Sequence, residues 1–289
     1  REGEVVTSLI EQFHYPRTGP GLMYDTMQAR TTELGGEILT EHTATRLEWE
    51  ESASGSRRVT RVHALDPEGS EISYEAEHVI SSMPLTLLIR GLEPRVPEKV
   101  WEAAHALTFR NLLTIDLIVD HPDLFPDNWI YVHDPDLQLG RVQNFKNWSP
   151  EMVPDPSKTS LGLEYFCWDD DALWTSSEEE LIALGTREIK ETGLLKGASI
   201  EDGTIVRVPK AYPVYRKGYE KHLDILVEFL KGFENLHPIG RYGMFKYNNA
   251  DHSILTALLT VENINGAAHD VWAVNTDTDY QEVRRETGS

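Results

Sequence analysis

Hydrophobic and polar residues alternate with different periods in three stretches of the chain. In the first stretch, Leu22, Met23, Met27 and Leu34 recur near helical spacing, which predicts a helix that ends at the glycine pair 35–36. Alternating patterns then predict strands over residues 37–47, 58–65 and 71–77, and a short buried strand from residue 78 that ends at Pro84. We expect residues 1–84 to form one unit.

The middle stretch, residues 85–233, is richer in aromatic residues and prolines. Its apolar and alternating runs predict strands over residues 111–119, 128–134, 141–148 and 160–168, separated by proline-rich turns. Neighbours of this kind form an antiparallel sheet most easily. A further strand over 203–215 contains two prolines, which predicts a place at the edge of that sheet. Helical spacing predicts helices over 176–194 and 218–230.

The last stretch, residues 234–289, combines a short strand over 236–241 with a helix over 250–264 and a polar tail after residue 275. Asn249 is the predicted N-cap of this helix, and His252 is expected to be satisfied in the capping region. An apolar stripe on the helix is predicted to pack on a sheet, while a face of small residues permits close approach. The stripe is Ile254, Leu255, Leu258 and Leu259, and the small face is Thr256, Ala257 and Thr260.

Charge and composition exclude several classes of protein. The chain has 27 Lys and Arg against 48 Asp and Glu, a net charge of −21, which opposes binding to nucleic acid or to anionic membranes. No apolar run approaches the length that a transmembrane segment needs. We therefore expect a soluble protein with a small-molecule substrate, while the oligomeric state stays open.

Cysteine and histidine residues exclude two further kinds of site. Cys167 is the single cysteine, so an internal disulfide and a cysteine-ligated metal site are excluded, and a cytoplasmic location is expected. The eleven histidines are dispersed and show no metal-ligand spacing. We expect no metal site.

Three segments resemble one enzyme superfamily. They are YPRTGPGLMYDTMQARTTELGGEILTEHTATRLEWE from Tyr15, EAEHVISSMPL from Glu75, and IGRYGMFKYNNADHSILTALLTVENI from Ile239. They are similar to the flavin-dependent amine oxidase superfamily, which includes protoporphyrinogen oxidase, phytoene desaturase and UDP-galactopyranose mutase. The segment RVQNFKNWSPEMVPDPSKTSLGLEYFCW extends the resemblance over most of the chain.

The resemblance implies an α/β (α+β) fold with FAD as the cofactor. Residues 1–84 and 234–289 would form an incomplete FAD/NAD(P)-binding domain, and residues 85–233 a substrate domain with a mainly antiparallel sheet and helices. The dinucleotide fingerprint Gly-x-Gly-x-x-Gly is absent from the sequence, and the chain opens on Arg1. We therefore expect the later part of a longer protein, with FAD bound to the full-length protein and absent from the chain as given.

The resemblance also implies which residues approach FAD. Thr43 would lie beside the adenine, and Ser81, Ser82, Met83 and Pro84 near the adenine–ribose half. The terminal glycine segment would approach the phosphates and the ribityl chain with Gly240, Arg241 and Tyr242, followed by Asn249 and Asp251 at the start of the last helix. Ordinary buried strand ends are the alternative interpretation of these segments.

Candidate substrate-binding residues come from a loop and two strands. In the family, the loop that contains Arg17 faces the flavin, where an arginine can bind an anionic group; an exposed loop arginine is the alternative. Alternation places Asn144, Lys146 and Trp148 on one face of the strand 141–148. Arg207, Tyr212 and Tyr215 form a positive and aromatic patch on the strand 203–215, and we expect the two strands to be neighbours. A solvated sheet face and a guarded sheet edge are the alternatives.

The predicted function is oxidation or desaturation of an organic substrate by hydride transfer to flavin, so that no catalytic triad is expected. One alternative is an isomerase of the UDP-galactopyranose mutase type, in which reduced flavin is a nucleophile toward a sugar carbon. The other is a binding or scaffold protein that keeps the fold without turnover. The residues do not decide between these three.

Overall fold

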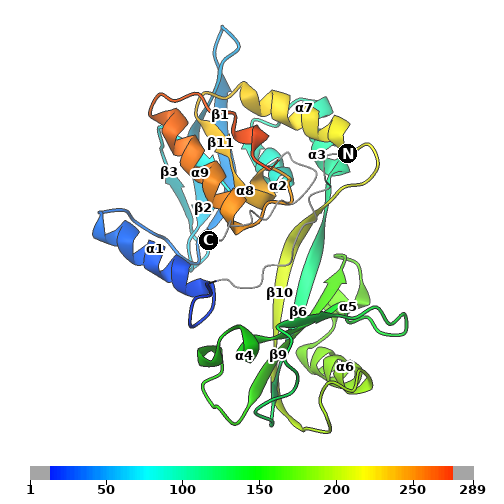
Figure 1. Ribbon diagram of the computed structural model, residues 1–289. Helices are drawn as coiled ribbons and strands as arrows, with labels where there is room; N and C mark the ends of the chain where they lie inside the picture. The colour runs from blue at the N-terminus through cyan, green and yellow to red at the C-terminus, as the bar shows by residue number, and fades with distance from the viewer. Residues whose placement is uncertain (1–13, 276–289) are drawn as a thin grey trace, which may run out of the picture.

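The structure, a computed structural model, describes residues 14–275 and shows two units connected by two long strands (Figure 1). The connecting strands are β6 (Thr108–Val119) and β10 (Ile200–Val214), which pair antiparallel along most of their length. Both units mix helices and strands, so the predicted α/β (α+β) fold is confirmed.

The first unit is built on a four-stranded sheet in the order β3-β2-β1-β5. Strands β1 (Thr43–Glu51), β2 (Arg57–Leu65) and β3 (Glu71–Tyr74) form an antiparallel meander, and β5 (Leu92–Glu93) pairs parallel with β1. Helices α2 (Leu85–Arg90), α3 (Glu98–Ala106) and α7 (Tyr219–Lys231) cover it, because their apolar stripes join the cluster around Leu47 and Val59. Apolar residues of the segments 85–107 and 219–233 therefore contribute to the core of the first unit.

A second, two-stranded sheet lies in the same unit. Strands β4 (Val79–Ser81) and β11 (Leu236–Pro238) pair in parallel, so their carboxyl ends meet. The buried side chain of Asn235 ties this pair to β2, since its amide accepts the N–H of Val59 at 2.8 Å and donates to the carbonyl of Val59 at 2.9 Å. Helices α8 (Gly240–Gly243) and α9 (Ala250–Ile264) follow β11, and the short helix η2 (Val271–Ala273) packs against α9.

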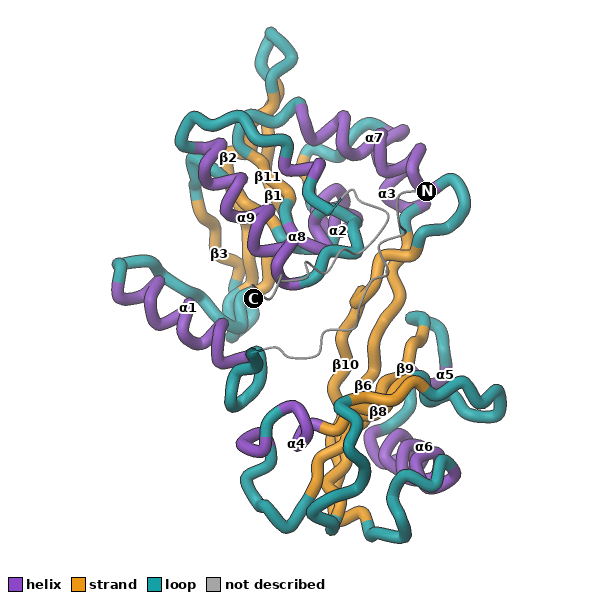
Figure 2. Tube along the Cα trace, viewed as in Figure 1, coloured by secondary structure: helices purple, strands orange, loops and turns teal. Residues whose placement is uncertain are grey.

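The second unit is a five-stranded antiparallel sheet in the order β10-β6-β9-β8-β7. Its other strands are β7 (Trp129–Tyr131), β8 (Arg141–Asn144) and β9 (Thr159–Cys167). Helix α6 (Glu178–Glu191) covers one face, and the short elements α4 (Phe145–Trp148), η1 (Pro150–Met152) and α5 (Ala172–Thr175) connect the strands (Figure 2). The antiparallel sheet and the edge position of β10 are confirmed.

Alternation along the strands gives the sheet two different faces. Odd-numbered residues such as Ile115 and Leu163 pack with Leu181 and Ile189 of α6 in a closed apolar cluster. Even-numbered residues of β6 and β9 point to the opposite face, which carries Asp116 and Glu164. We call this the open face; it is the face that α6 leaves uncovered.

Two predicted strands are shorter or different in the structure. The chain leaves the sheet after Asn144 and turns into α4, because Lys146 and Asn147 bind carbonyls of the loops beside the sheet instead of ladder partners. Strands β8 and β10 are also separated by β6 and β9, so the prediction that they are neighbours was wrong. The predicted strand 37–47 begins only at Thr43, after a turn in which Glu41 has a left-handed backbone.

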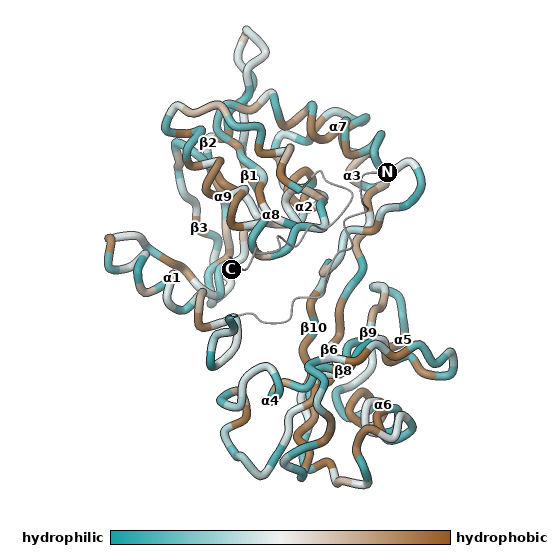
Figure 3. Tube along the Cα trace, viewed as in Figure 1, coloured by the Kyte–Doolittle hydropathy of each residue, from teal (hydrophilic) through white to brown (hydrophobic). Residues whose placement is uncertain are grey.

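Helix α9 has the predicted bounds but the opposite orientation. Thr256 and Thr260 are its buried residues, whereas Leu255 and Leu258 are 43% and 56% exposed. The threonine face packs inward because the hydroxyl of Thr256 accepts the N–H of Gly240 at 3.0 Å. Figure 3 shows α9, with several apolar residues along it, at the periphery of the first unit.

The predicted first helix is present as α1 (Gly21–Glu33), and none of its residues is buried. It stands apart from both units in Figure 1. Within residues 14–275, no helix is both long enough and apolar enough to cross a bilayer.

Candidate functional site

An arginine that contacts two stacked tyrosine rings lies where the two units meet. The guanidinium carbon of Arg241 on α8 is 4.1 Å from the ring centroid of Tyr247 and 4.9 Å from that of Tyr212 on β10. The two tyrosine rings are stacked with their centroids 5.9 Å apart. Arg241, Tyr212 and Tyr247 are called the junction cluster below.

The guanidinium of Arg241 has hydrogen-bonding capacity that the described residues leave unused. Its Nε and Nη2 atoms are buried and have no hydrogen-bond partner within residues 14–275. A buried charged donor without a partner is costly, so such a group is best explained by an anionic ligand that completes it. Because the guanidinium contacts two aromatic rings and faces no carboxylate of the described part of the chain at salt-bridge distance, it is suited to receive a phosphate or a carboxylate.

The backbone is strained on each side of this cluster. Lys210 on β10 and the fully buried Phe245 have φ angles of 56° and 51°, and Asn275 has a φ of 55°. A left-handed backbone costs a residue such as Lys or Phe about 1–2 kcal/mol, and such strain concentrates at functional sites. Lys210 is held in this state by its N–H, which donates to Asn111 Oδ1 at 2.8 Å.

Tyr215 contacts the backbone of the junction cluster. Its hydroxyl accepts the N–H of Tyr247 at 2.7 Å, and its ring stacks on Tyr219 and packs against Phe245. Burial raises the pKa of Tyr212 and of Tyr215 above the usual value, so both hydroxyls stay protonated at neutral pH. The junction cluster therefore offers neutral hydroxyls beside a cation.

The residues predicted for FAD gather at the carboxyl ends of β4 and β11. The N–H of Ile239 donates to the carbonyl of Ser81 at 2.9 Å, which brings the segments 81–84 and 240–242 together. Ligands of α/β folds bind at this edge of parallel strands. The hydroxyl of Ser81 is buried there without a hydrogen-bond partner in the described residues, which fits a missing ligand at the strand end.

The glycines of α8 do not have equal roles. Gly240 has a φ of 74°, and its N–H is already bound to Thr256, so it is not available to a phosphate. Gly243 is the close-contact glycine, because a Cβ there would lie 2.6 Å from the carbonyl oxygen of Ser81. Close approach at this turn therefore depends on Gly243, which the sequence interpretation did not single out.

The remaining predicted cofactor residues lie on other elements. Thr43 begins β1 in the four-stranded sheet and is exposed. Asn249 precedes α9 as predicted, and its N–H donates to Nδ1 of His252 at 3.3 Å, which places His252 in the cap. Asp251 lies in the first turn of α9. Their roles toward FAD stay predictions.

An acidic network occupies the open face of the sheet. Glu164 is buried and accepts hydrogen bonds from Arg141 at 2.5 Å and from Gln143 at 3.0 Å, both on β8. Asp116 faces Gly162 across the β6–β9 ladder, and its Oδ1 is buried without a described partner. Burial and the charge of Glu164 raise the pKa of Asp116 to about 6. Asp116 is thus a carboxyl group that titrates close to neutral pH.

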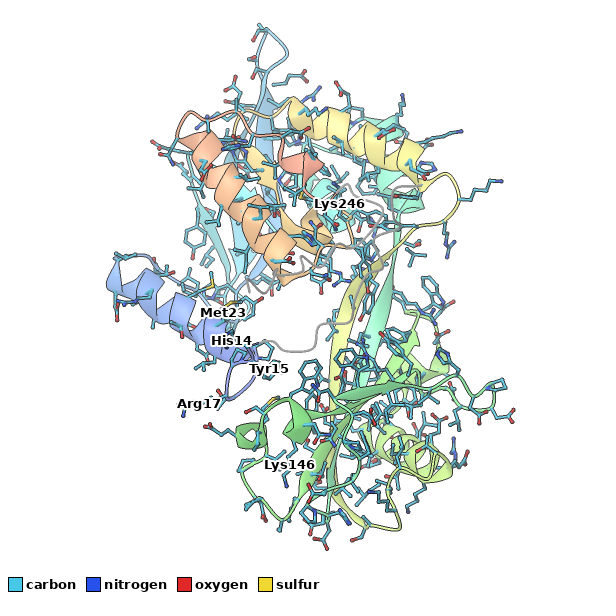
Figure 4. The ribbon with its side chains drawn as sticks, viewed as in Figure 1. His14, Tyr15, Arg17, Met23, Lys146 and Lys246 are labelled. Carbon is cyan, nitrogen blue, oxygen red and sulfur yellow. The ribbon has the colours of Figure 1, made fainter. Side chains whose placement is uncertain are left out.

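An aromatic stack borders this face. Trp148 is stacked between Trp129 and Tyr15, with ring centroids 5.1 Å apart on each side. Its indole N–H donates to Gln143 Oε1 at 3.0 Å, so the stack joins the network of Glu164. Figure 4 shows Tyr15 and Arg17 in the loop before α1, on the side of the second unit. Arg17 lies 3.5 Å from Glu151 and is largely exposed, as in the alternative interpretation.

Sequence comparison decides the family. The profile of flavin-containing amine oxidoreductases matches residues 3–248. The chain belongs to the flavin-containing amine oxidoreductase family. The superfamily assignment made from the three segments is confirmed. No curated protein matches the chain.

Several solved structures have a fold similar to that of this chain. Reduced UDP-galactopyranose mutase superposes with a TM-score of 0.71 and 19% identity, over 91% of this chain and 54% of the mutase. A putative protoporphyrinogen oxidase from Exiguobacterium sp. 255-15 gives 0.56 and 17% identity, over 83% and 50%. An oxidoreductase from Methanosarcina mazei gives 0.57 and 14% identity, over 84% and 55%. The chain spans about half the length of these proteins, and at these identities the likeness shows the fold alone.

In this member of the amine oxidoreductase family, three residues that were predicted to bind substrate donate hydrogen bonds to backbone carbonyls. The ammonium of Lys146 donates to the carbonyls of Pro122, Pro156 and Lys158 at 2.6–2.9 Å, which uses all its donors. Asn144 is buried and donates to the carbonyl of Phe125. Arg207 binds the carbonyls of Trp174 and Ser176, beside α6 and away from the open face. All three fix loops.

The residues that the sequence interpretation missed are Asp116, Glu164, Arg141 and Tyr247. Each is a polar residue in a strand or turn, and the pattern around it does not show which residue it contacts. The polar residues inside the apolar runs NLLTIDLIV and SLGLEYFCW were the available signal, since a charged residue in a central strand needs a partner. Among the described residues, no group of three His, Cys, Asp or Glu side chains is placed to hold a metal ion.

Proposed function

We propose that this chain supplies the substrate-binding sheet and the C-terminal strand end of an FAD-dependent enzyme that acts on a small anionic substrate. The observation that carries this proposal is Arg241, whose buried Nε and Nη2 have no partner within residues 14–275 and whose guanidinium contacts the rings of Tyr212 and Tyr247. A phosphate or carboxylate placed there would accept charge-assisted hydrogen bonds from the guanidinium. The open face of the sheet would hold the rest of the substrate.

The residues that would hold FAD lie at the ends of β4 and β11. Ser81 to Pro84 would line the adenine–ribose half, with the Ser81 hydroxyl, which has no partner among the described residues, as a donor. The turn at Gly240 to Tyr242 would approach the phosphates and ribityl chain without the N–H of Gly240, which is bound to Thr256. When bound, FAD supplies an acceptor for a substrate hydride or, in its reduced form, a nucleophile. Thr43, Asn249 and Asp251 stay candidates for the same cofactor.

Hydride transfer from an organic substrate is the first proposed reaction, because the family is one of oxidoreductases. In this reaction the chain binds the anionic group at Arg241, orients the substrate with Tyr212 and Tyr215, and limits water at the open face. Asp116, with a pKa near 6, is placed on that face as a group that can accept or release a proton.

Isomerisation of a nucleotide sugar is the second candidate, and Arg241 favours it. A diphosphate needs at least one arginine with available donors and gains from neighbouring hydroxyls. The junction cluster offers Arg241, with two donors that no residue within 14–275 binds, and the hydroxyls of Tyr212 and Tyr247. One structural neighbour is a mutase of UDP-galactopyranose, which makes a nucleotide sugar the second substrate class to test.

Anion binding can be tested on the chain itself. Inorganic pyrophosphate titrated by calorimetry should bind to the chain, and Arg241→Gln should weaken this binding at least tenfold, about 1.4 kcal/mol. Arg207→Gln is the matched control, since it removes the same charge from an arginine whose donors bind carbonyls. Equal weakening by both variants would show that net charge, and not the junction cluster, attracts the anion.

The reaction class can be tested in a protein that carries this chain together with a dinucleotide-binding segment. A redox substrate should bleach the visible absorbance of bound flavin without air, whereas a nucleotide sugar should turn over only after the flavin has been reduced. Saturation with UDP or with a porphyrin distinguishes the substrate classes. A flavin that no reductant bleaches would leave the binding or scaffold alternative.

FAD should not stay bound to the chain as given. The pyrophosphate loop supplies several backbone donors and a helix dipole, each worth on the order of 1 kcal/mol, and these are absent from the sequence. Stoichiometric FAD after purification of this chain would contradict this.

A further inference from the structure

The last described segment of the chain is tied to the junction cluster by side chains that no proposed step uses. It comprises residues 271–275, and we call it the strap. The ammonium of Lys246 donates to the carbonyls of Trp272 at 2.5 Å and Val274 at 2.9 Å. Figure 4 shows Lys246 in the first unit, close to α8 and η2.

The end of the strap makes the reverse contacts. The side-chain amide of Asn275 donates to the carbonyl of Tyr247 at 3.2 Å and to Oδ1 of Asn248 at 3.0 Å. Asn248 is buried and donates to the carbonyl of Gly240 at 3.2 Å. Hydrogen bonds thus run from the strap through residues 246–248 to the start of α8, which carries Arg241.

Tyr247 is 52% exposed, so burial alone does not fix its position and these contacts do. Its N–H is held by the hydroxyl of Tyr215, and its carbonyl by Asn275, so its backbone is fixed from both sides. Phe245 and Asn275 also have left-handed backbones, which an unsupported turn would relax. Burying the ammonium of Lys246, whose pKa is lowered by this burial, is a further cost that its two carbonyl partners offset.

We propose that the strap positions Tyr247 over Arg241, with Lys246 and Asn275 as its positioning residues, and so sets the affinity of the junction cluster for an anionic group. The proposal rests on the proposed anion-binding role of Arg241. It assigns a function to a C-terminal segment that lies outside the matched profile, which ends at residue 248.

Asn275→Gly is the sharpest variant. Glycine accepts the left-handed backbone of this position, so the variant removes the two side-chain donations and keeps the main-chain path. Asn147→Ala is the matched control, because Asn147 also donates to two carbonyls, those of Phe125 and Asp127 in the second unit. Lys246→Met tests the other end of the strap.

Two measurements on the full chain decide the proposal. Titration with inorganic pyrophosphate should show binding weakened about fivefold by Asn275→Gly, as expected for loss of a positioning hydrogen bond, and unchanged by Asn147→Ala. Hydrogen exchange of the amides of residues 245–249 should become faster in Asn275→Gly and Lys246→Met, and stay the same in Asn147→Ala.

The outcomes separate this inference from the proposed function. Unchanged exchange in residues 245–249, or faster exchange with unchanged pyrophosphate affinity, would overturn the positioning role even if Arg241 binds the anion. If the unaltered chain binds no pyrophosphate while Asn275→Gly still speeds exchange, the anion site is wrong and the strap is shown to hold Tyr247.

Discussion

Replacing Asp116 by asparagine should stabilise the chain at neutral pH. Asp116 lies on the open face of the sheet, with Oδ1 buried and without a described partner, and it is close enough to Glu164 to be affected by that charge. Ionisation of Asp116 therefore places a second negative charge in a partly dry site. Asparagine has the same shape and carries no charge.

The magnitude follows from the shift in pKa. Burial first, and Glu164 second, raise the pKa of Asp116 from its ordinary 3.8 to about 6. A shift of about two pH units corresponds to about 3 kcal/mol for a fully buried group. Because the side chain is only partly buried, solvent screening reduces this to about 1–2 kcal/mol.

The pH dependence has a definite sign. In the folded state Asp116 keeps its proton up to about pH 6, whereas in the unfolded state it loses the proton near pH 3.8. The folded state therefore binds more protons between these values, and the free energy of unfolding falls as pH rises from about 4 to 6. This contribution is fully present below pH 3.8 and is lost above about pH 6.

Urea unfolding of the chain at pH 4, 5, 6 and 7 measures the effect, and a carbon-13 titration of the aspartate carboxyls measures the pKa directly. Asp116→Asn should raise the free energy of unfolding at pH 7 by about 1–2 kcal/mol and remove the fall between pH 4 and 6. Asp120→Asn, at the exposed end of the same strand, should change it by less than about 0.5 kcal/mol. A variant with the same pH profile as the unaltered chain, or a measured pKa near 4, would refute the reasoning.

Three further substitutions test contacts of the site. Gly243→Ala should lower the free energy of unfolding by about 2 kcal/mol or more, because its Cβ would lie 2.6 Å from the carbonyl oxygen of Ser81. Gly21→Ala is the control: its Cβ would have no atom within 4 Å, so the free energy of unfolding in the same urea assay should not change. Lys146→Met should cost about 2–3 kcal/mol of stability by leaving three carbonyls unpaired, and should leave pyrophosphate affinity unchanged. The exposed Lys231→Met should change neither the stability nor the affinity. Lys210→Gly should raise the free energy of unfolding by about 0.5–1 kcal/mol, because glycine adopts the left-handed backbone of this position without strain. Lys210→Ala keeps the strain and should not raise it. Equal effects of the two variants would show that the backbone is not strained.

The spacing of apolar residues and prolines along the sequence predicted the bounds and types of several elements. Helix α9 over 250–264 and strand β10 at a sheet edge follow from spacing and from prolines. The orientation of α9 did not follow, because the choice between its apolar stripe and its threonine face depends on a partner from another segment. The hydroxyl of Thr256 receives the N–H of Gly240, sixteen residues away, and periodicity within the helix carries no information about that bond.

The candidate site shows the same limit for side chains. The strand patterns predicted Lys146 and Arg207 as substrate-binding residues, and the resemblance predicted Arg241 near the cofactor. The structure separates them by their partners: backbone carbonyls bind Lys146 and Arg207, whereas Arg241 has two donors without a partner in the described part of the chain. Whether a cation fixes a loop or awaits a ligand is decided by tertiary contacts, which a single sequence does not contain.

The position of Arg241 also connects the two proposed ligands. Its helix α8 begins directly after β11, so the residue preceding Arg241 lies at the strand end where the cofactor is proposed to bind. Tyr247, which follows α8, contacts the guanidinium of Arg241, and Tyr212 contacts it from β10 in the sheet of the other unit. A shift of α8 would therefore move the proposed cofactor edge and the anion site together. In a flavin enzyme the substrate must meet the cofactor at one reactive distance, and a single short helix that carries the proposed contacts to both would provide that alignment.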